Sequence, residues 1–493
     1  MAGTPNNVVL FFPELLENQH PLLVPLELLS LAPPLLSAGF DVRILDERLE
    51  PLPTLNLQAE LSRAICVGIS IRPGGQVFRG FRFARAVKAI RPDLPVVMGG
   101  WFPSIVPERV LAHPAVDYVV TGEGETAFLE LVNALSSGRP AAGIPGIATV
   151  QDGRVEHTAH IPSSHIASSP CPAYQLLDIE RYIGPERELS YISSKGCTGT
   201  CKFCAIHCGY ADQWHPRPAD TVIRDITQLV RTYQLRRIRF VDANFFADEE
   251  RVRAIMDGFI REGLGIEWQA PGRADQINTL SDDTWDLLQR GGCRRIEVGA
   301  ESATQRILDD MDKGITPDDI RTFAEKTHRY GIAGIFNYIL GIPGETLEDL
   351  RRTIDAIHAL RRDHPDSTFA IYRFSPIPIT ELYAPLQGAP PGETDPESIE
   401  HYQIYRLTPD QPWIERHQAR IVDMIFYFYL PFSLRTSHLS PSPVALLKHL
   451  LIRSARARIR RFDFRFPFEW WLLRLGTRIG LCNPQRFRQW AQS

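Results

Sequence analysis

The stretch SSKGCTGTCKFCAIHCGY, residues 193–210, places four of the eight cysteines of this 493-residue chain within a dozen positions. Cys197, Cys201 and Cys204 follow the spacing C-x3-C-x2-C, and Cys208 comes four residues later. In a reducing compartment, thiols this close together are more typical of metal ligands or catalytic groups than of disulfides. The stretch therefore predicts a metal or iron–sulfur site on a tight loop.

This spacing allows two kinds of site, a zinc site and a 4Fe-4S cluster with one open iron. A structural zinc site usually joins two separated pairs of ligands, and here only His207 and Cys208 could complete such a set. A bacterial ferredoxin run would be C-x2-C-x2-C with further cysteines for closure, and the sequence lacks both features. Three thiolates on one loop can instead hold three irons of a 4Fe-4S cluster and leave the fourth iron open. Cys208 is then expected to be a free or buried thiol, because cysteine often behaves as a small hydrophobic residue.

The cysteine loop follows the first of six strand-like segments that alternate with helical ones over residues 189–389. These segments read LSYISSKGC, RRIRFVDANF, IEWQAPGRAD, RRIEVGAES, GIFNYILGIPG and TFAIYRFSPIP. Apolar runs separated by helices of 3.6-residue periodicity indicate parallel βαβ units. Six such units predict either a partial barrel or an open sheet, which periodicity alone does not distinguish.

A second alternating array occupies residues 1–145. Its strand-like segments read NNVVLFF, DVRILD, ICVGISI, LPVVMGG and VDYVVTGEGE, and they predict a five-stranded, doubly wound, Rossmann-like domain that ends near Pro145. Such sheets bind ligands beyond the carboxyl ends of their strands. Those ends carry SIRPGGQ, GGWFPS and TGEGE, loops that let a large ligand approach the backbone. Residues 146–188 show little periodicity and are expected to form a connector.

The cysteine loop resembles the signature of the radical S-adenosylmethionine (SAM) superfamily, C-x3-C-x-aromatic-C, with Phe203 at the aromatic position. The resemblance implies that Cys197, Cys201 and Cys204 bind a 4Fe-4S cluster after the first strand of a partial barrel. It also implies that the amino and carboxylate groups of SAM chelate the open iron. The reduced cluster would then cleave the sulfonium to a 5'-deoxyadenosyl radical.

Four further segments, FVDANFF, APGRAD, EVGAESATQRILDDMDKGIT and FNYILGIPGET, resemble in order the second to fifth strand segments of the subgroup with an N-terminal cobalamin domain. An ordered set of motifs is more specific than the cysteine triad alone. The residues that the resemblance places near SAM are Phe203, Glu301, Ser302, Gly341, Ile342 and Gly344. The alternative is that Glu301 only forms a cap or pairs with Arg273, and that GIPGE is only a turn at the end of a strand.

The N-terminal domain resembles the cobalamin-binding domain of the same subgroup. The residues implied at the corrin are Ser70, Arg72, Gly99, Gly100, Gly122 and Glu123. The D-x-H-x-x-G motif is missing, and His20 and His113 lie outside the expected loops, so cobalamin would bind without a protein histidine below cobalt. Arg72 would approach the lower face, where a cation favours electron-rich cobalt.

Two alternatives remain for this domain. Arg72 could be a surface residue that pairs with Asp46 or Glu47 or stacks on the domain edge. The domain could also keep the fold without binding a corrin, since fold does not fix function.

The C-terminal region, residues 390–493, is predicted to be helical and basic. From Leu434 onward it holds twelve Lys and Arg against two Asp and Glu, a local balance of +10 in a chain of net charge −4. The segment RSARARIRRFDFRFPFEWWLLRLGTRIG interleaves arginines with aromatic residues, as do helices that lie on anionic membranes. The alternative is that these helices pack against the barrel with solvated arginines. No nucleic-acid recognition module is evident.

The resemblance implies a cobalamin-dependent radical SAM methyltransferase that methylates an unactivated carbon of a natural-product, lipid or tetrapyrrole intermediate. The alternatives are an oxidative cyclase of the anaerobic magnesium-protoporphyrin ester cyclase type and a non-catalytic corrin or cluster sensor. Flavodoxin or ferredoxin is the expected electron donor. We expect a cytoplasmic protein, with peripheral membrane contact if the interfacial interpretation holds, because no signal sequence and no apolar run of membrane-spanning length is evident.

Overall fold

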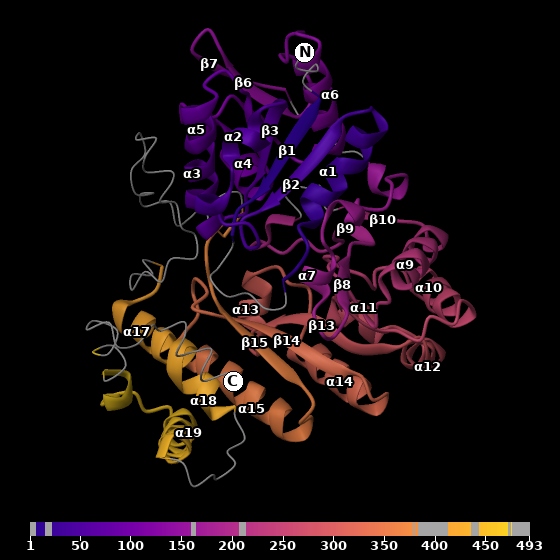
Figure 1. Ribbon diagram of the computed structural model, residues 1–493. Helices are drawn as coiled ribbons and strands as arrows, with labels where there is room; N and C mark the ends of the chain where they lie inside the picture. The colour runs from indigo at the N-terminus through magenta and orange to yellow at the C-terminus, as the bar shows by residue number, and fades with distance from the viewer. Residues whose placement is uncertain are drawn as a thin grey trace.

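The computed structural model describes residues 6–14, 22–158, 164–206, 213–377, 380–382, 413–434, 443–471 and 475. Two β-sheets, each flanked by helices, follow one another along the chain, and C-terminal helices pack beside the second sheet (Figure 1). The predicted class, an α/β chain with a Rossmann-like domain, a partial barrel and C-terminal helices, is confirmed.

The N-terminal sheet has seven strands in the order β2-β1-β3-β4-β5-β6-β7. The five predicted strands are parallel to one another, and their order reverses at β1, as in a doubly wound fold. The strands are β1 (Asn7–Phe12), β2 (Asp41–Asp46), β3 (Ala64–Ser70), β4 (Val96–Gly99), β5 (Tyr118–Val120), β6 (Ile147–Gln151) and β7 (Arg154–His157). The helices are α1 (Leu26–Ser37), α2 (Leu57–Leu61), α3 (Gly75–Ile90), α4 (Trp101–Ile105), α5 (Pro107–Leu111) and α6 (Gly124–Ser136), with a 3-10 turn, η1 (Leu52–Thr54).

The sheet extends beyond the predicted end of the domain near Pro145. Strands β6 and β7 form an antiparallel hairpin that adds to the edge of the sheet at β5. All four residues of β7 are exposed, so this strand has no alternation of apolar and polar residues for sequence analysis to detect. Residues 146–157 therefore belong to the sheet and not to the connector.

The rest of the connector links the two sheets. Its described elements are η2 (Ser164–Ala167), η3 (Tyr174–Leu176) and α7 (Glu180–Ile183). The hydroxyl of Tyr174 donates to the backbone oxygen of Ser190, and that of Tyr182 donates to Oδ2 of Asp46, both at 2.8 Å. Both hydroxyls are buried, so these bonds fix the connector to β8 on one side and to β2 on the other.

The second sheet contains the six predicted strands in the order β15-β14-β13-β12-β11-β8, all of them parallel. They are β8 (Glu188–Tyr191), β11 (Arg237–Phe240), β12 (Glu267–Gly272), β13 (Cys293–Glu301), β14 (Ala333–Leu340) and β15 (Thr368–Arg373). The strand order never reverses, and right-handed crossovers then place the connecting helices on one face of the sheet. Strands β8 and β15 do not pair with each other. The sheet is therefore a partial barrel, which resolves the alternative left open by the sequence.

The crossover helices are α9 (Ala219–Tyr233), α10 (Glu249–Arg261), α11 (Ala274–Asn278), α12 (Asp282–Arg290), α13 (Gln305–Asp310), α14 (Pro317–Arg329) and α15 (Leu347–Asp363). Capping boxes start α14 and α15, where the side chains of Thr316 and Thr346 each accept from the backbone N–H three residues later. These caps satisfy donors that would otherwise lack partners at the helix start.

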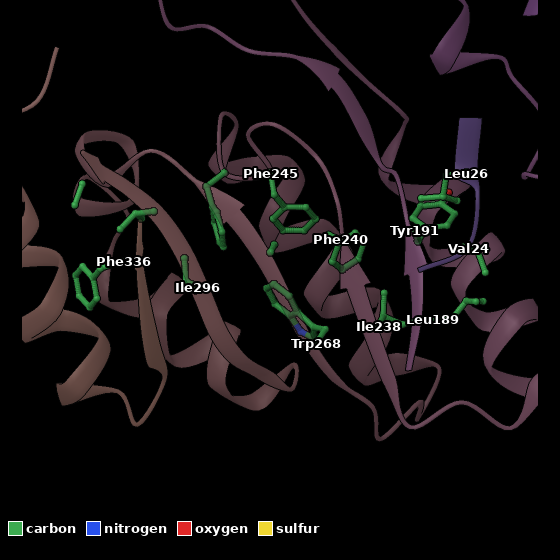
Figure 2. Close-up of a cluster of buried hydrophobic side chains, with 14 of the residues drawn as sticks. Val24, Leu26, Leu189, Tyr191, Ile238, Phe240, Phe245, Trp268, Ile296 and Phe336 are labelled. Atoms are coloured by element: carbon green, nitrogen blue, oxygen red, sulfur yellow. The ribbon is translucent and has the colours of Figure 1, made fainter. Parts of the chain in front are cut away.

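The hydrophobic core is continuous across the two sheets, as Figure 2 shows. Leu26 of α1 and Tyr191 of β8 belong to the same cluster, which continues along the barrel to Phe336. Within it the Phe240 ring lies 4.6 Å from that of Phe245 and 5.8 Å from that of Trp268, centre to centre. One side of the N-terminal sheet therefore shares its packing with the barrel, whereas Val9, Phe11 and their neighbours form a second cluster within the N-terminal domain.

The C-terminal helices are α17 (Arg416–Met424), α18 (Leu430–Ser433) and α19 (Pro443–Arg461), with a π-helical turn, η5 (Ile425–Tyr429), between the first two. They pack beside the barrel, where the Ser433 hydroxyl lies 3.1 Å from Nε2 of His358 on α15 (Figure 1). In the described part of the chain, no helix combines the length and the apolar character needed to cross a bilayer.

Candidate active site

The cysteine loop leaves from and returns to a short antiparallel hairpin. Strand β9 (Ser194–Gly196) ends directly before Cys197, and β10 (Trp214–Pro216) pairs back onto β9. Within the loop the Gly199 N–H donates to Sγ of Cys197 at 3.4 Å, and the Cys204 N–H donates to the backbone oxygen of Cys201 at 3.0 Å. The hairpin thus closes the base of the loop and gathers the three thiols on one side of the barrel.

The three thiols share one buried environment. Cys201 is buried and the other two are partly buried. Burial raises the pKa of the Cys204 thiol to about 11, and its proximity to Cys201 and Cys197 acts in the same direction. Metal binding must displace these protons, because the thiolate is the ligand.

Two cations lie against the thiols. The guanidinium of Arg273, at the end of β12, has Nη1 3.7 Å from Sγ of Cys201, and its Nη2 donates to the backbone oxygen of Lys313 at 2.7 Å. Burial raises the pKa of the Cys201 thiol. The positive charges of Lys313 and Arg273 act against this increase. A Cβ at position 199 would lie 2.5 Å from Nη1 of Arg273, so Gly199 makes room for this guanidinium.

The donor set fits an iron–sulfur cluster. Each thiolate in a 4Fe-4S cluster binds a different iron, whereas a zinc site draws its ligands around a single ion. His207 and Cys208, which the zinc interpretation requires, lie outside the described residues.

A buried polar network supports the base of the loop. Asp242, which follows β11, accepts hydrogen bonds from the backbone N–H of Ser193 at 2.7 Å and from the hydroxyls of Ser193 and Ser194 at 2.6 and 2.7 Å. Burial raises the pKa of Asp242, although these hydrogen bonds and the nearby Arg251 act against the increase. Arg251 donates to the backbone oxygen of Ser193 at 2.9 Å. Three donors of residues 193 and 194 thus bind Asp242, and Arg251 donates to Ser193, so four hydrogen bonds hold the start of the hairpin in front of the barrel.

Glu301 lies at the end of β13 in the left-handed region, with φ +57°. Its Oε1 accepts from Nζ of Lys313 at 2.7 Å, and that ammonium lies 5.7 Å from the centre of the Phe203 ring. The alternative pairing of Glu301 with Arg273 is wrong, because Arg273 instead forms an ion pair with Asp275 at 3.1 Å. A non-glycine residue held at positive φ is uncommon and is often found at functional sites.

Ser302 is buried, with its hydroxyl 3.2 Å from Oγ1 of Thr353 on α15. The same hydroxyl accepts from the backbone N–H of Thr304 at 3.2 Å. These bonds turn the chain from β13 into α13, so the serine has a clear structural role. The contact of Glu301 and Ser302 with SAM stays a prediction.

The GIPG segment forms a turn after β14 at which Gly341 and Gly344 have φ +78° and +79°. The Gly341 N–H donates to Oε2 of Glu345 at 2.7 Å, and the Gly341 oxygen accepts from Nε1 of Trp413 at 2.8 Å. Burial raises the pKa of Glu345 to about 8, and its Oε1 is buried with no hydrogen-bond partner among the described residues.

A small hydrophobic cluster joins the cysteine loop to this turn. Ile342 is buried against Phe374, and Phe203 and Trp413 pack on the same cluster. The structure thus brings together Phe203 and Ile342, two residues that the sequence assigned separately to SAM. Trp413 was missed, because it precedes α17 and no motif marks it.

The predicted cobalamin residues lie at the carboxyl ends of β3, β4 and β5. Ser70 ends β3, and Gly100 follows β4 with φ +92°. A Cβ at Gly100 would lie 2.8 Å from the backbone oxygen of Ile71, so only glycine permits this approach. The Gly122 N–H, at φ +71° after β5, donates to the Ser104 hydroxyl at 3.0 Å. The glycine loops, with Gly99 at the end of β4, therefore form one connected surface; their contact with a corrin stays a prediction.

Arg72 pairs with Glu27 in the first turn of α1, at 3.1 Å. The alternative that it pairs with Asp46 or Glu47 is wrong, because Asp46 binds Arg48 and Glu47 binds Arg82. The approach of Arg72 to a corrin stays a prediction, and nearly half of its side chain is exposed.

His113 lies inside the N-terminal domain, with its ring 4.7 Å from that of Phe81. Burial lowers the pKa of His113, and the charge of Arg85 acts in the same direction. Its packing in the core places it among structural residues. His20 lies outside the described residues.

The two sets of loops meet at Lys195, which the sequence did not single out. This residue is in β9, two positions before Cys197, and its Nζ lies 2.6 Å from Oε1 of Glu125 and 3.1 Å from Oε1 of Glu123. Both glutamates belong to the GEGE turn after β5. The predicted cobalamin loops and the cysteine loop are therefore in direct ionic contact.

Models of known protein families match both parts of the chain. The radical SAM superfamily model matches residues 191–357, and the B12 binding domain model matches residues 18–132. The first range holds the cysteine loop and strands β11 to β14, and the second holds the loops after β3, β4 and β5. Each family model therefore covers one of the two sets of loops described above.

Individual proteins resemble the chain over most of its length. An uncharacterized methyltransferase of Pyrococcus horikoshii is 30% identical over 348 residues, which cover 70% of this chain and 74% of that protein. The anaerobic magnesium-protoporphyrin IX monomethyl ester cyclase of Synechocystis sp. is 25% identical over 402 residues, 79% of each chain. Among solved structures, the cobalamin-dependent S-adenosylmethionine radical enzyme OxsB with aqua-cobalamin bound superposes with a TM-score of 0.73 at 16% identity, covering 97% of this chain and 76% of that one, which shows the shared fold.

A cysteine loop suited to a cluster, a preceding B12 domain in the same chain, and a relative at 30% identity over more than two thirds of both proteins agree with one another. The cofactors are accordingly a 4Fe-4S cluster, SAM and cobalamin. This chain belongs to the cobalamin-dependent radical S-adenosylmethionine enzymes.

Proposed function

We propose that the protein is a C-methyltransferase that uses SAM and cobalamin to methylate an unactivated carbon of a small molecule. The observation that carries the proposal is the contact between the GEGE turn and the cysteine loop, with Nζ of Lys195 2.6 Å from Oε1 of Glu125. Because the contact joins the two cofactor-binding loop sets, a substrate between them can reach both cofactors. Cobalamin supplies methyl transfer, and the cluster with SAM supplies a radical that removes hydrogen.

The residues of the chain position these groups and are not required to exchange protons. The open barrel face carries the thiols, and the partly buried Phe203 and Trp413, which pack on the buried Ile342, offer an apolar surface for a nucleoside. Arg273 and Lys313 bring two positive charges to the thiolates, which offsets the negative charge of a reduced cluster. Placement of the two cofactors and the substrate is then the main contribution of the protein.

A second candidate function is oxidative ring closure, favoured by the cyclase relative that covers 79% of the chain. A third, a corrin or cluster sensor without catalysis, would keep the cofactors and lack turnover. Anaerobic incubation with methyl-labelled SAM and a one-electron reductant separates them. Methyl transfer predicts both S-adenosylhomocysteine and 5'-deoxyadenosine. Cyclisation predicts 5'-deoxyadenosine alone, and a sensor predicts neither product.

The substrate class depends on the C-terminal region. Ile452, Ala455 and Ile459 are buried on one side of α19, and Arg458 pairs with Glu469 at 3.1 Å, so this helix packs against the protein. Phe466, after that helix, is 75% exposed. We infer a small-molecule substrate of natural-product type. If the exposed aromatic residues contact a membrane, the inferred substrate is instead a lipid or a tetrapyrrole.

Binding of the protein to vesicles with and without anionic lipid tests that contact, and no binding to either would leave the soluble substrate class. The same proposal places the protein in the cytoplasm, where flavodoxin or ferredoxin would supply the electron that SAM cleavage consumes. Replacing the chemical reductant by reduced flavodoxin tests this, with 5'-deoxyadenosine as the product measured.

A further inference from the structure

Lys195 occupies an unusual position between the cofactor loops. It lies in the middle of β9, opposite His215 of β10, and the strand runs directly into Cys197. Only 15% of its side chain is exposed, and its ammonium reaches across to the N-terminal domain. A displacement of this residue would therefore be passed to the first cluster ligand within two peptide units.

The partners of Lys195 belong to the turn that carries the cobalamin loop after β5. Glu123 is the residue before α6, and Glu125 lies in the first turn of that helix. Their side chains are 8% and 19% exposed. Burial alone would raise the pKa of Glu125, but the charge and the hydrogen bond of Lys195 outweigh it, and the pKa lies below the usual range.

The turn is itself tied to the neighbouring loop. Gly122, adjacent to Glu123, donates its N–H to the hydroxyl of Ser104 at 3.0 Å, and that hydroxyl donates to the backbone oxygen of Gly100 at 2.8 Å. A continuous series of contacts thus runs from the glycine loop after β4, through the GEGE turn and Lys195, to the cysteine loop. Charge-assisted hydrogen bonds are stronger and more directional than neutral ones.

Contacts other than that of Lys195 also hold the N-terminal domain against the barrel. The shared core and the hydrogen bond from Tyr182 to Asp46 hold the N-terminal domain on the barrel away from the thiols. Removing the charge of Lys195 should therefore leave the two domains attached. It would remove the cation that contacts the Glu123 and Glu125 carboxylates at 3.1 and 2.6 Å, so this attraction across the cofactor loops would be lost and this end of the interface would open.

We propose that Lys195 is a positioning residue that, through Glu123 and Glu125, sets the separation and relative orientation of the cobalamin and cluster sites. The inference rests on the proposed function, since it assumes that both cofactors act together. Its consequence is that methyl transfer to cobalamin requires the contact, whereas reductive cleavage of SAM at the cluster does not.

The test compares the fully reconstituted wild type with Lys195→Met, which keeps the length of the side chain, and Lys195→Arg, which keeps the charge. Pulsed electron paramagnetic resonance measures the distance distribution between cob(II)alamin and the reduced cluster. We expect one narrow distribution in the wild type and in Lys195→Arg, and a broader or longer one in Lys195→Met. An unchanged distribution in Lys195→Met would overturn the proposal.

The accompanying activity measurement uses labelled SAM alone. Lys195→Met should form 5'-deoxyadenosine within about twofold of the wild type, while S-adenosylhomocysteine per 5'-deoxyadenosine falls about tenfold, equivalent to about 1.4 kcal/mol. An unchanged product ratio would also overturn the proposal. If the wild type itself forms neither product, the proposed function fails, which is a separate result.

Two further variants distinguish a specific role of Lys195 from a general loosening of the structure. The double variant Glu123→Gln with Glu125→Gln keeps the hydrogen-bond acceptors, leaves Lys195 in place and should broaden the distribution in the same way. Tyr182→Phe removes the hydrogen bond to Asp46 that ties the connector to the N-terminal domain and should match the wild type in distance and product ratio. A broadening in Tyr182→Phe equal to that in Lys195→Met would show a general loosening of the domains and would overturn a specific role for Lys195.

Discussion

The ammonium of Lys313 lies 2.7 Å from the Glu301 carboxylate, buried beside the cysteine loop. Burial alone would lower the pKa of Lys313, but the charge of Glu301 and the nearby Cys201 outweigh it, and the pKa lies above its usual range. The lysine is therefore charged under working conditions. Gly299, two residues before Glu301, has no side chain, and a Cβ there would collide with both charged groups. The segment GAES thus makes a buried ion pair at the thiols possible.

Lys313→Met should make reduction of the cluster harder. Removing the ammonium takes a positive charge from the thiolate environment and leaves the Glu301 carboxylate without its partner. Both changes disfavour an added electron, by tens of millivolts for a charge at this range. Potentiometric titration monitored by electron paramagnetic resonance measures the shift. Lys326→Met is the matched control, because that ammonium binds the backbone oxygen of Asn278 on the helical side of the barrel. An equal potential in wild type and Lys313→Met would contradict this electrostatic role.

Gly100→Ala should weaken cobalamin binding. The glycine has φ +92°, and an added Cβ would lie 2.8 Å from the backbone oxygen of Ile71 and 3.0 Å from Oγ of Ser70. The loop must shift to relieve this contact, at a cost of about 1–3 kcal/mol. We expect at least about a tenfold rise in the dissociation constant for hydroxocobalamin, equivalent to about 1.4 kcal/mol, measured by titration.

Gly138→Ala is the control for that variant. Gly138 also has positive φ, +64°, but nothing lies within 4 Å of its Cβ position. It should lower stability through backbone strain and leave cobalamin affinity unchanged. Equal affinity of both variants would argue that the glycine loop does not contact the corrin.

Glu345→Gln should flatten the pH dependence of stability. Burial raises the pKa of Glu345 to about 8 from a usual value of 4.5, so the folded state binds the proton more tightly than the unfolded state. The stability due to this proton is present at acid pH and is lost as pH rises through about 8, amounting to a few kcal/mol. Glutamine keeps the acceptor for the Gly341 N–H without the charge.

Thermal unfolding from about pH 5 to about pH 8 measures this effect. The melting temperature of the wild type should fall by several degrees relative to that of the variant over this range. Parallel curves for the two proteins would show that Glu345 is ionised in the folded state at all these pH values.

Asp242→Ala should destabilise the cysteine hairpin. Three hydrogen bonds from Ser193 and Ser194 end on this carboxylate, and their donors are buried. Buried donors without partners cost about 1–3 kcal/mol each. We expect a lower melting temperature and a reduced iron content after reconstitution. The exposed Asp318→Ala, whose partner is Arg321 on the same helix, should change neither quantity.

The sequence predicted those features that local patterns determine. The alternation of apolar strands and amphipathic helices gave both parallel sheets, and the spacing of Cys197, Cys201 and Cys204 gave the cluster loop. Strand β7 escaped prediction because all of its residues are exposed and its existence depends on pairing with β6.

Ionic partners could not be predicted, because the tertiary fold selects among many charges. Arg72 pairs with Glu27, which lies 45 residues earlier in the sequence, and not with Asp46 or Glu47. Lys195 likewise meets Glu125 across 70 positions of sequence. The sequence marks Arg72 as a candidate residue and places Lys195 beside the cysteines, but neither side chain carries a local signal for its ionic partner.

Metal analysis after anaerobic reconstitution with iron, sulfide and hydroxocobalamin tests the central claim most directly. The two-cofactor account predicts about four iron atoms and about one cobalt per desalted wild-type chain. It also predicts that Cys201→Ala loses the iron and keeps the cobalt, because the two sites are built from different domains. Iron without cobalt in the wild type, or an intact cluster in Cys201→Ala, would contradict the account.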